Sequence, residues 1–264
     1  MRAYPPLEED IMDLGLKGLR ALVTGGTKGI GLAIAETLAA EGADVALVSR
    51  NAIEAEATAA RLAGKGVKTL GAGVDVSDGP ALAAFVDQAA AAFGGLDIVV
   101  ANVSALAVGN DEESWRKGFN TDLLGTVRLV NAALPYLEKS GAASILTISS
   151  VSGREIDFAA GPYGTFKAAL IHYTQGLAYQ LAPKKIRANT VSPGNTYFDG
   201  GIWNTIKDGN PTLFAEALAL NPTGRMATPQ EIANAAVFLA SPAASFVYGT
   251  NLVVDGALTR GVQF

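Results

Sequence analysis

Cysteine is absent from this chain, and histidine occurs only once in 264 residues, at His172. Without cysteine there is no disulfide bond, thiol nucleophile or thiolate-bound zinc. One histidine cannot build a multi-histidine metal centre, so we expect no metal site. His172 follows Lys167 by five residues, about 500° around a helix, and we expect it to pack or to lie at an interface rather than to catalyse.

Long apolar runs and an excess of positive charge are also missing. No apolar stretch approaches the roughly 18 residues of a transmembrane helix, and the first ten residues carry no apolar signal-peptide core. The 20 Lys and Arg residues are outnumbered by 25 Asp and Glu, a net charge of −5 that disfavours nucleic acid and anionic membranes as partners. We therefore expect a soluble, cytoplasmic protein without such partners, with an N-terminal arm over residues 1–16.

The chain instead alternates short apolar runs with Ala-rich segments of helical periodicity. Strands are predicted at residues 20–24, 44–48, 67–74, 96–100, 143–149, 186–191 and 251–254. Helices are predicted after residue 29 and over 53–62, 80–93, 114–137 (one or two helices), 165–182 and 229–239. Apolar strands without polar alternation, separated by helices, indicate a parallel sheet covered on both faces. We predict one α/β domain over residues 1–264, a doubly wound Rossmann fold with a seven-stranded, mostly parallel sheet.

A glycine-rich turn lies between the first predicted strand and the first helix. Glycine there permits a tight turn and lets backbone N–H groups approach a pyrophosphate at the helix N-terminus. A strand before and a helix after are the context that dinucleotide binding requires. The turn residues predicted to bind the cofactor are Thr24, Gly25, Thr27, Lys28, Gly29, Ile30 and Gly31.

The end of the second predicted strand bears on the choice of dinucleotide. An NAD site typically has a carboxylate there, which binds the ribose 2′-hydroxyl. Here Ser49 and Arg50 follow the strand, and Lys28 adds a cation in the glycine turn. Two cations without a carboxylate favour the 2′-phosphate of NADP, so we predict NADP(H). The alternative is that Lys28 and Arg50 are solvated surface charges.

Tyr163 and Lys167 have the i, i+4 spacing that puts both on one face of a helix. A free phenol has a pKa of about 10 and is a poor acid–base group at neutral pH. An ammonium about 4 Å away, at an effective dielectric of about 20, favours the phenolate by roughly 4 kcal/mol. The pair is a candidate proton shuttle, although this spacing also arises by chance.

Taken together, these motifs resemble those of the short-chain dehydrogenase/reductases, single-domain Rossmann oxidoreductases, over residues 17–256. The order and spacing of the motifs carry the resemblance. The motifs are the Thr24–Gly31 turn, Asp75-Val76, Asn120, Ser150, Tyr163 with Lys167, Val191-Ser-Pro-Gly194 and the ending 224–256.

The resemblance implies a catalytic role for four residues. Ser150 would hold the substrate oxygen, and Tyr163 would pass the proton to or from it. Lys167 would bind the nicotinamide ribose and promote ionisation of Tyr163, while Asn120 would position a water that connects Lys167 to bulk solvent. Hydride would move between the nicotinamide and the substrate carbon.

The resemblance also implies cofactor contacts outside the glycine turn. These are Asp75 and Val76 at the adenine, Asn102 at the adenosine ribose, and Pro193, Gly194 and Thr196 after the sixth strand. Two segments depart from the family pattern. The usual Asn-Asn-Ala-Gly is Ala101-Asn102-Val103-Ser104 here, which puts a side chain where glycine leaves room. The positions two and four residues after Gly194, usually Ile and Thr, hold Thr196 and Phe198.

Two segments border the predicted site on the substrate side. Residues 195–220 combine aromatic side chains with glycines and predict either a lid or two short helices that pack on their own domain. Residues 151–162 offer Arg154, Glu155, Asp157 and Phe158, for recognition of a polar substrate group or for contact with solvent.

An apolar helical stripe, Leu123, Leu124, Val127, Val130 and Leu134, is expected to pack in the core. The resemblance implies that this helix and the tyrosine helix contact a partner subunit, in a homotetramer or a homodimer.

Three functions are compatible with these features. The first is an NADP-dependent reductase or dehydrogenase acting on a ketone or secondary alcohol of a small, largely apolar substrate. The second is a 3-oxoacyl-acyl-carrier-protein reductase, for which Lys184, Lys185 and Arg187 could bind the acidic carrier. The third is an inactive NADP-binding sensor or scaffold. Such a protein would be expected to lack Ser150, Tyr163 or Lys167, and all three are present.

Overall fold

The computed structural model of the protein describes residues 12–262, and its centre is a sheet of seven parallel strands. The strand order is β3-β2-β1-β4-β5-β6-β7. The bounds are β1 (Arg20–Thr24), β2 (Asp44–Ser49), β3 (Thr69–Gly73), β4 (Ile98–Ala101), β5 (Ser144–Ile148), β6 (Arg187–Pro193) and β7 (Asn251–Val254). The predicted doubly wound α/β fold is confirmed, and every strand pair is parallel.

Helices connect the strands and begin where the sequence supplies a cap. Asn51, Asp78 and Thr228 each accept a backbone N–H of the first turn of the helix that follows. The helices are α1 (Gly29–Ala40), α2 (Ala52–Ala63), α3 (Gly79–Phe93), α4 (Glu112–Gly118), α5 (Leu124–Leu137), α6 (Pro162–Leu181), α7 (Ile202–Gly209), α8 (Pro211–Leu220) and α9 (Pro229–Ala240).

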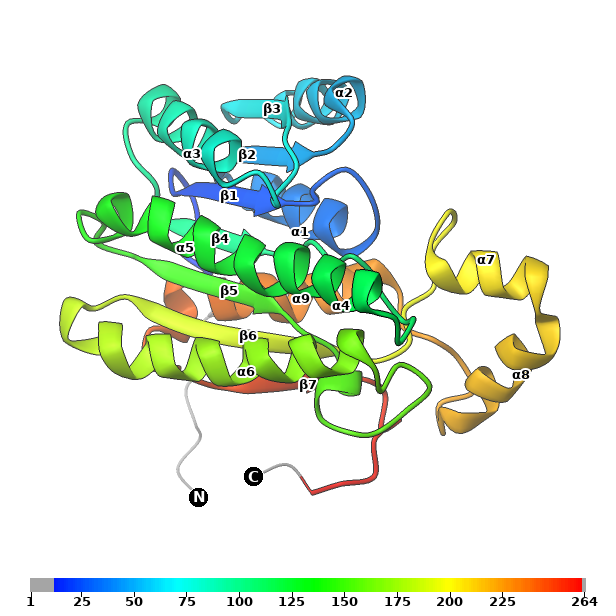
Figure 1. Ribbon diagram of the computed structural model, residues 1–264. Coiled ribbons are helices and arrows are strands. Elements are labelled where there is room, and N and C mark those ends of the chain that lie inside the picture. Colours follow the sequence, from blue (N-terminus) through cyan, green and yellow to red (C-terminus); the bar gives the residue numbers. More distant parts are fainter. Residues whose placement is uncertain (1–11, 263–264) are drawn as a thin grey trace, which may run out of the picture.

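Both faces of the sheet are covered, which explains why its central strands are apolar throughout. Helices α1, α2 and α9 pack on one face, against side chains such as Val23 and Leu47. Helices α3, α5 and α6 pack on the other, against Leu22 and Val99. Figure 1 shows these layers, with α7 and α8 set apart beyond the carboxyl ends of the strands.

The strand order reverses between β1 and β4, because β2 lies on one side of β1 and β4 on the other. In doubly wound sheets the crevice outside the carboxyl ends at such a point is where ligands bind. Helices α7 and α8 also lie beyond the carboxyl ends of the strands (Figure 1). The fold therefore places the predicted glycine turn, which follows β1, at the expected position of a site.

Several predicted boundaries are wrong in detail. The region 114–137, predicted as one or two helices, forms two, α4 and α5, which are joined by a π-helical turn at Phe119–Leu123, and α4 begins two residues earlier than predicted. The tyrosine helix α6 begins at Pro162 rather than at residue 165. Residues 1–11 of the expected N-terminal arm lie outside the described residues, but Leu16 is 1% exposed and belongs to the core.

The apolar stripe of α5 is also only partly in the core. Val130 is buried, whereas Leu123, Leu124, Val127 and Leu134 are half-buried. The side of α5 that faces the sheet carries instead Gly125, Thr126, Leu129, Val130, Ala133 and Leu137. The stripe prediction followed the helical spacing of large apolar side chains, whereas packing against the sheet decides which side of the helix is buried.

Candidate active site

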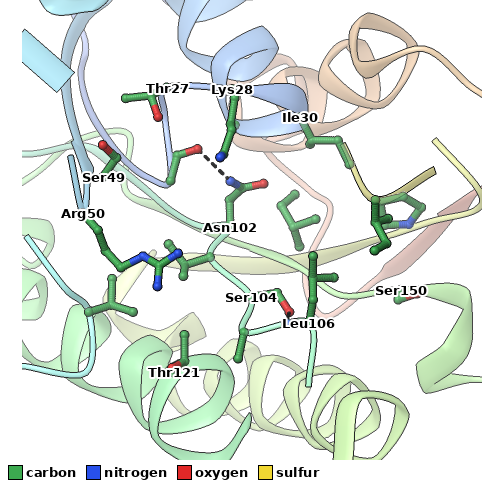
Figure 2. A pocket seen from close by; sticks show the side chains of 18 of the residues that line it. Thr27, Lys28, Ile30, Ser49, Arg50, Asn102, Ser104, Leu106, Thr121 and Ser150 are labelled. Carbon is green, nitrogen blue, oxygen red and sulfur yellow. Dashed lines mark hydrogen bonds between the residues drawn. The ribbon is translucent and has the colours of Figure 1, made fainter. Parts of the chain in front are cut away.

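A cavity of about 500 Å³ opens at the carboxyl ends of the strands, between the glycine turn and helix α6. Figure 2 shows Ser49 and Arg50 at one end of it and Ser150 at the other. Most of the predicted site residues line this cavity. They are Gly25, Thr27, Lys28, Ile30, Gly31, Ser49, Arg50, Asp75, Val76, Asn102, Ser150, Tyr163, Lys167, Pro193, Gly194 and Thr196.

The glycine turn is held by contacts with the end of β4. Buried Thr24 donates its hydroxyl to the Val100 carbonyl at 3.2 Å and accepts the backbone N–H of Asn102 at 3.1 Å. The Asn102 side-chain amide donates to the carbonyls of Thr24 and Gly25, at 3.1 and 3.2 Å. Thr24 and Asn102 therefore fix the shape of the turn. Thr24 itself does not line the cavity.

Three glycines shape the backbone of this turn. Gly25 and Gly29 have φ of +66° and +55°, in the left-handed region that favours glycine. A β-carbon at Gly31 would lie 2.2 Å from the Gly25 carbonyl oxygen. Gly25 and Gly31 line the cavity, so a ligand can approach the backbone there, as a pyrophosphate requires, whereas the Phe198 ring covers Gly29.

Phe198 changes the surroundings of the glycine turn at one of the two departures from the family pattern. Its ring lies so close to Gly29 that a β-carbon there would be 2.5 Å from the Phe198 ring. Gly29 itself does not line the cavity, whereas Phe198 does. At this position an aromatic ring replaces the hydroxyl of the usual threonine. Thr196 is present, but its own hydroxyl donates to the Gly194 carbonyl at 3.1 Å.

The end of the cavity near β2 is polar. Arg50 and Lys28 are exposed and line it from different segments. The Ser49 hydroxyl donates to the Asn51 carbonyl at 2.9 Å. Hydrogen bonds from the hydroxyl and backbone N–H of Ser77 lower the pKa of Asp75, and the charge of Arg50 adds to this effect. Asp75 is therefore an anionic hydrogen-bond acceptor at neutral pH.

Tyr163 and Lys167 lie at the other end, on the first two turns of α6. The Lys167 ammonium is 5.7 Å from the centre of the Tyr163 ring and donates to the Ile148 carbonyl at 3.0 Å. Ser149 anchors the helix by donating its hydroxyl to the Lys167 carbonyl at 2.8 Å. Lys167 is only 2% exposed, so its charge acts on Tyr163 with little screening by solvent.

Ser150 is held in the cavity wall by its neighbours. Its hydroxyl oxygen accepts the backbone N–H of Ser152 at 3.2 Å and lies 3.3 Å from the Ser152 hydroxyl. Ser152 in turn donates to the Asp157 carboxylate at 2.5 Å. Asp157 therefore makes a structural contact behind Ser150 and does not line the cavity.

The structure does not bring Asn120 to Lys167. Asn120 is exposed and does not line the cavity. Two residues further on, roughly 200° around the helix, Asp122 is buried and its Oδ1 lies 3.6 Å from the Lys167 ammonium. The resemblance implied Asn120 at this place, whereas the structure has Asp122 beside Lys167. The sequence did contain a signal for Asp122. It lies three residues before Gly125, which puts it on the buried side of the helix.

Apolar side chains surround the Tyr163 end of the cavity. Leu106, Ile202 and Trp203 line it, and Leu106 has φ of +49°, unusual for a side chain of this size. Trp203 is 5% exposed and meets Phe158 edge to face at 5.8 Å. Leu106, Lys117 and Thr121 were not predicted to line the cavity, because the loop after β4, helix α4 and the π-helical turn carry no motif that marks them.

The remaining polar residues lie outside the cavity. His172 is exposed on α6, and Arg154 and Glu155 do not line the cavity either. The Glu155 carboxylate accepts the backbone N–H of Gly261 at 3.1 Å. Within residues 12–262, no helix is long and apolar enough to cross a membrane.

Comparison with known proteins places this site in a family. A family model described as enoyl-(acyl carrier protein) reductase matches residues 25–259. Isoepoxydon dehydrogenase patN of Penicillium expansum is 40% identical over 261 residues, which cover 96% of this chain and 100% of the relative. The chain belongs to the short-chain dehydrogenase/reductase family. It is thus an NAD(P)-dependent oxidoreductase that acts on CH–OH or C=O groups.

Solved structures of other short-chain dehydrogenase/reductases have the same fold. One from Burkholderia cenocepacia, in complex with NADP, superposes with a TM-score of 0.83 at 31% identity, covering 92% of this chain and 99% of the other. L-sorbose reductase of Gluconobacter frateurii, complexed with NADPH and L-sorbose, has a TM-score of 0.87 at 30% identity, covering 95% and 100%. The accessible backbone at Gly25 and Gly31 fits the nicotinamide dinucleotide that this family uses.

Proposed function

We propose that this short-chain dehydrogenase/reductase is NADP(H)-dependent and interconverts a ketone and a secondary alcohol on a small, largely apolar substrate, with Tyr163 as acid and base. The observation that carries the proposal is the placement of Ser150, Tyr163 and Lys167 at one end of the cavity whose walls include the glycine turn. The cofactor, when bound, supplies or accepts the hydride.

Each of these side chains has a distinct task in the proposed reaction. The Ser150 hydroxyl, held by Ser152, donates a hydrogen bond to the substrate oxygen. The Tyr163 hydroxyl gives a proton to that oxygen during reduction and removes it during oxidation. Lys167, buried beside Tyr163, stabilises the phenolate form. Pro193, Gly194, Val76 and Asn102 are proposed as cofactor contacts because they line the same cavity.

Charge at the β2 end supports NADP(H). Arg50 and Lys28 both line the cavity there, and the end of β2 supplies no carboxylate to repel a 2′-phosphate. The Ser49 hydroxyl oxygen and the N-terminus of α2, capped by Asn51, lie in the same region. The NADP and NADPH bound to the structures from Burkholderia cenocepacia and Gluconobacter frateurii agree with this assignment.

The substrate class follows from the cavity wall near Tyr163. Leu106, Ile202 and Trp203 are apolar, so they favour a substrate whose body is apolar and whose reacting oxygen is its main polar group there. Trp203 lies in the segment 195–220, which we propose as the lid because its helix α7 contributes to the wall.

An acyl-carrier substrate, the alternative suggested by the family model's description, has less support. The Arg187 guanidinium is buried and donates to the carbonyls of Leu239, Ala240 and Ser241, so it cannot bind a carrier. Lys184 pairs with Glu138 at 2.6 Å. Of the three basic residues predicted to bind the carrier, only Lys185 is therefore neither buried nor paired with a carboxylate in the contacts described above, because the charge of Lys184 is neutralised.

We also propose a homotetramer or homodimer in which α5 and α6 face a partner subunit. The half-buried Leu124, Val127 and Leu134 of α5, with half-buried Leu123 and exposed Phe119 of the π-helical turn, supply apolar surface for it. Light scattering on the purified protein tests this. The cytoplasmic location stays a prediction.

The decisive experiment is NADPH oxidation against a panel of ketones that includes an acetoacetyl thioester. Tyr163→Phe is expected to lower the rate by at least about 10²-fold, the scale of a lost acid–base group. An inactive sensor would bind NADPH without turnover of any ketone. Activity that is confined to the thioester would favour the acyl-carrier alternative, and full activity of Tyr163→Phe would contradict the proposed mechanism.

A further inference from the structure

We propose that Leu106 is a specificity-determining residue, which favours ketones with an apolar group beside the carbonyl, and that Ser104 is the positioning residue that holds Leu106 in the cavity wall. Ser104 stands where the short-chain dehydrogenase/reductase pattern has glycine, so the arrangement depends on a residue in which this chain departs from that pattern. The proposal rests on the function proposed above and deepens it, because it names the side chain that distinguishes one ketone from another.

Leu106 has a backbone conformation that few leucines adopt. Its φ of +49° is in the left-handed region, where the β-carbon of an L-residue lies too close to the following carbonyl oxygen. Among the non-glycine residues within 12–262, Lys185 and Ala257 also have a positive φ, but neither lines the cavity. A residue in such a conformation persists only where its surroundings over-determine it, and such residues cluster at functional sites.

Contacts on both sides of Leu106 hold its backbone in this conformation. The Ser104 hydroxyl oxygen accepts the backbone N–H of Leu106 at 3.1 Å, which closes a turn over Ala105. The backbone N–H of Ala105 donates to the buried Asp122 carboxylate at 2.8 Å, and Ala107 is buried. The residues before and after Leu106 are therefore anchored, and the serine hydroxyl fixes the backbone N–H between them. Glycine at position 104 would supply no such acceptor.

The anchored loop presents the Leu106 side chain to the substrate end of the cavity. Figure 2 shows Leu106 between Ser104 and Ser150, the residue proposed to bind the reacting oxygen. Leu106 is 48% exposed, so nearly half of its surface is available to a ligand. An apolar group that covers this surface gains from removal of apolar area from water. A hydroxyl group at the same place would lose its hydration without gaining a hydrogen bond from the leucine.

Two glycine substitutions on this loop separate the strain from the contact. Leu106→Gly removes the apolar wall and relieves the left-handed backbone, so the melting temperature Tm is expected to stay the same or to rise. Val108→Gly is the matched control, because Val108 is also exposed on this loop but has no positive φ and does not line the cavity. This control is expected to lower Tm by about 2–4 °C and to keep the kinetics unchanged.

The contact is tested with ketones of one shape that differ in a methyl against a hydroxyl group, such as 4-methylcyclohexanone and 4-hydroxycyclohexanone. The unmodified protein is expected to prefer the methyl ketone in kcat/KM. In Leu106→Gly, KM for the methyl ketone is expected to rise about 10-fold and this preference to fall about 10-fold, the scale of a lost apolar contact in a specificity pocket. KM for NADPH should stay unchanged, since the contact is with the substrate.

Substitutions of Ser104 test its positioning role. Ser104→Ala removes the acceptor of the Leu106 N–H and is expected to raise KM for the methyl ketone about 3- to 10-fold at nearly constant kcat, because the leucine is then held less firmly. Ser104→Thr keeps the hydroxyl and is expected to keep the KM of the unmodified protein. In the Leu106→Gly background, Ser104→Ala should have no further effect on KM, because the hydroxyl acts through the leucine.

The outcomes separate this proposal from the proposed function. Unchanged preference between the two ketones in Leu106→Gly would overturn the proposal, and so would failure of that variant to fold, as judged by circular dichroism. A Tm that falls as far as in Val108→Gly would show that Leu106 is not strained. A Ser104→Ala effect that persists in the Leu106→Gly background would refute the positioning role. Absence of turnover of any ketone by the unmodified protein would instead contradict the proposed function, and the Tm comparison would still test the strain.

Discussion

Gly31 packs so closely on Gly25 that a β-carbon at position 31 would lie 2.2 Å from the Gly25 carbonyl oxygen. The neighbour is backbone, so no side-chain rotation can relieve the contact. The first turn of α1 and the turn after β1 therefore keep their relative positions only with glycine at this place. This contact sets the distance between the N-terminus of α1 and the cavity.

Gly31→Ala is expected to displace the glycine turn and to weaken NADPH binding by at least about 10-fold, since overpacking costs about 1–3 kcal/mol. Fluorescence titration with NADPH measures the affinity. Gly176→Ala on α6 is the matched control, because a methyl group there meets nothing within 4 Å. That control should bind normally and gain roughly 0.5–1 kcal/mol of stability from its helical position. Normal affinity of Gly31→Ala would contradict the packing argument.

Arg50→Ala is expected to lower affinity for NADPH by about 10- to 100-fold, the scale of a lost charge-assisted hydrogen bond, and to leave NADH affinity nearly unchanged. The reason is that only NADPH carries the 2′-phosphate. Separate titrations with the two cofactors measure the ratio. Lys65→Ala removes an exposed cation that does not line the cavity and is the control. Tighter binding of NADH than of NADPH by the unmodified protein would refute the phosphate assignment.

Trp203→Leu is expected to raise KM for an apolar ketone by about 10-fold, because the substrate loses roughly 1.4 kcal/mol of apolar contact. Phe158 is 62% exposed and touches Trp203, so Phe158→Leu should have a smaller effect. The two effects should be less than additive, since the rings act through one contact. Steady-state kinetics of both single variants and the double variant test this. Phe246→Leu, at a ring that is 98% exposed, serves as control.

Asp97→Asn is expected to destabilise the protein by on the order of 3 kcal/mol at pH 7, the scale for breaking a buried ion pair. Burial raises the pKa of Asp97, but hydrogen bonds from Arg20 and Ser140 outweigh it, so the pKa is lowered overall. The carboxylate thus stabilises the fold above pH of about 4 and loses this effect as the pH falls through its lowered pKa.

Urea unfolding of the unmodified protein and of Asp97→Asn between pH 7 and pH 3 measures this difference, which should shrink at the acid end. The exposed pair of Lys184 and Glu138 offers a comparison. Glu138→Gln should cost no more than about 1 kcal/mol at any pH. A constant difference between Asp97→Asn and the unmodified protein across this range would show that charge is not the cause.

The sequence alone determined the features that depend on neighbours along the chain. The alternation of apolar strands with helices predicted the parallel sheet, and the glycine turn between β1 and α1 predicted the position of the cavity. The spacing of Tyr163 and Lys167 placed both on one helix face, because helical geometry is local.

Only the tertiary structure decided which side chains meet across elements. It placed Asp122 rather than Asn120 beside Lys167 and buried Arg187 against the end of α9. It also brought Phe198 onto Gly29 and Trp203 onto Phe158. These contacts depend on the rotation of each helix and the course of each loop, which are set by packing over the whole sheet and are therefore not encoded in any one segment.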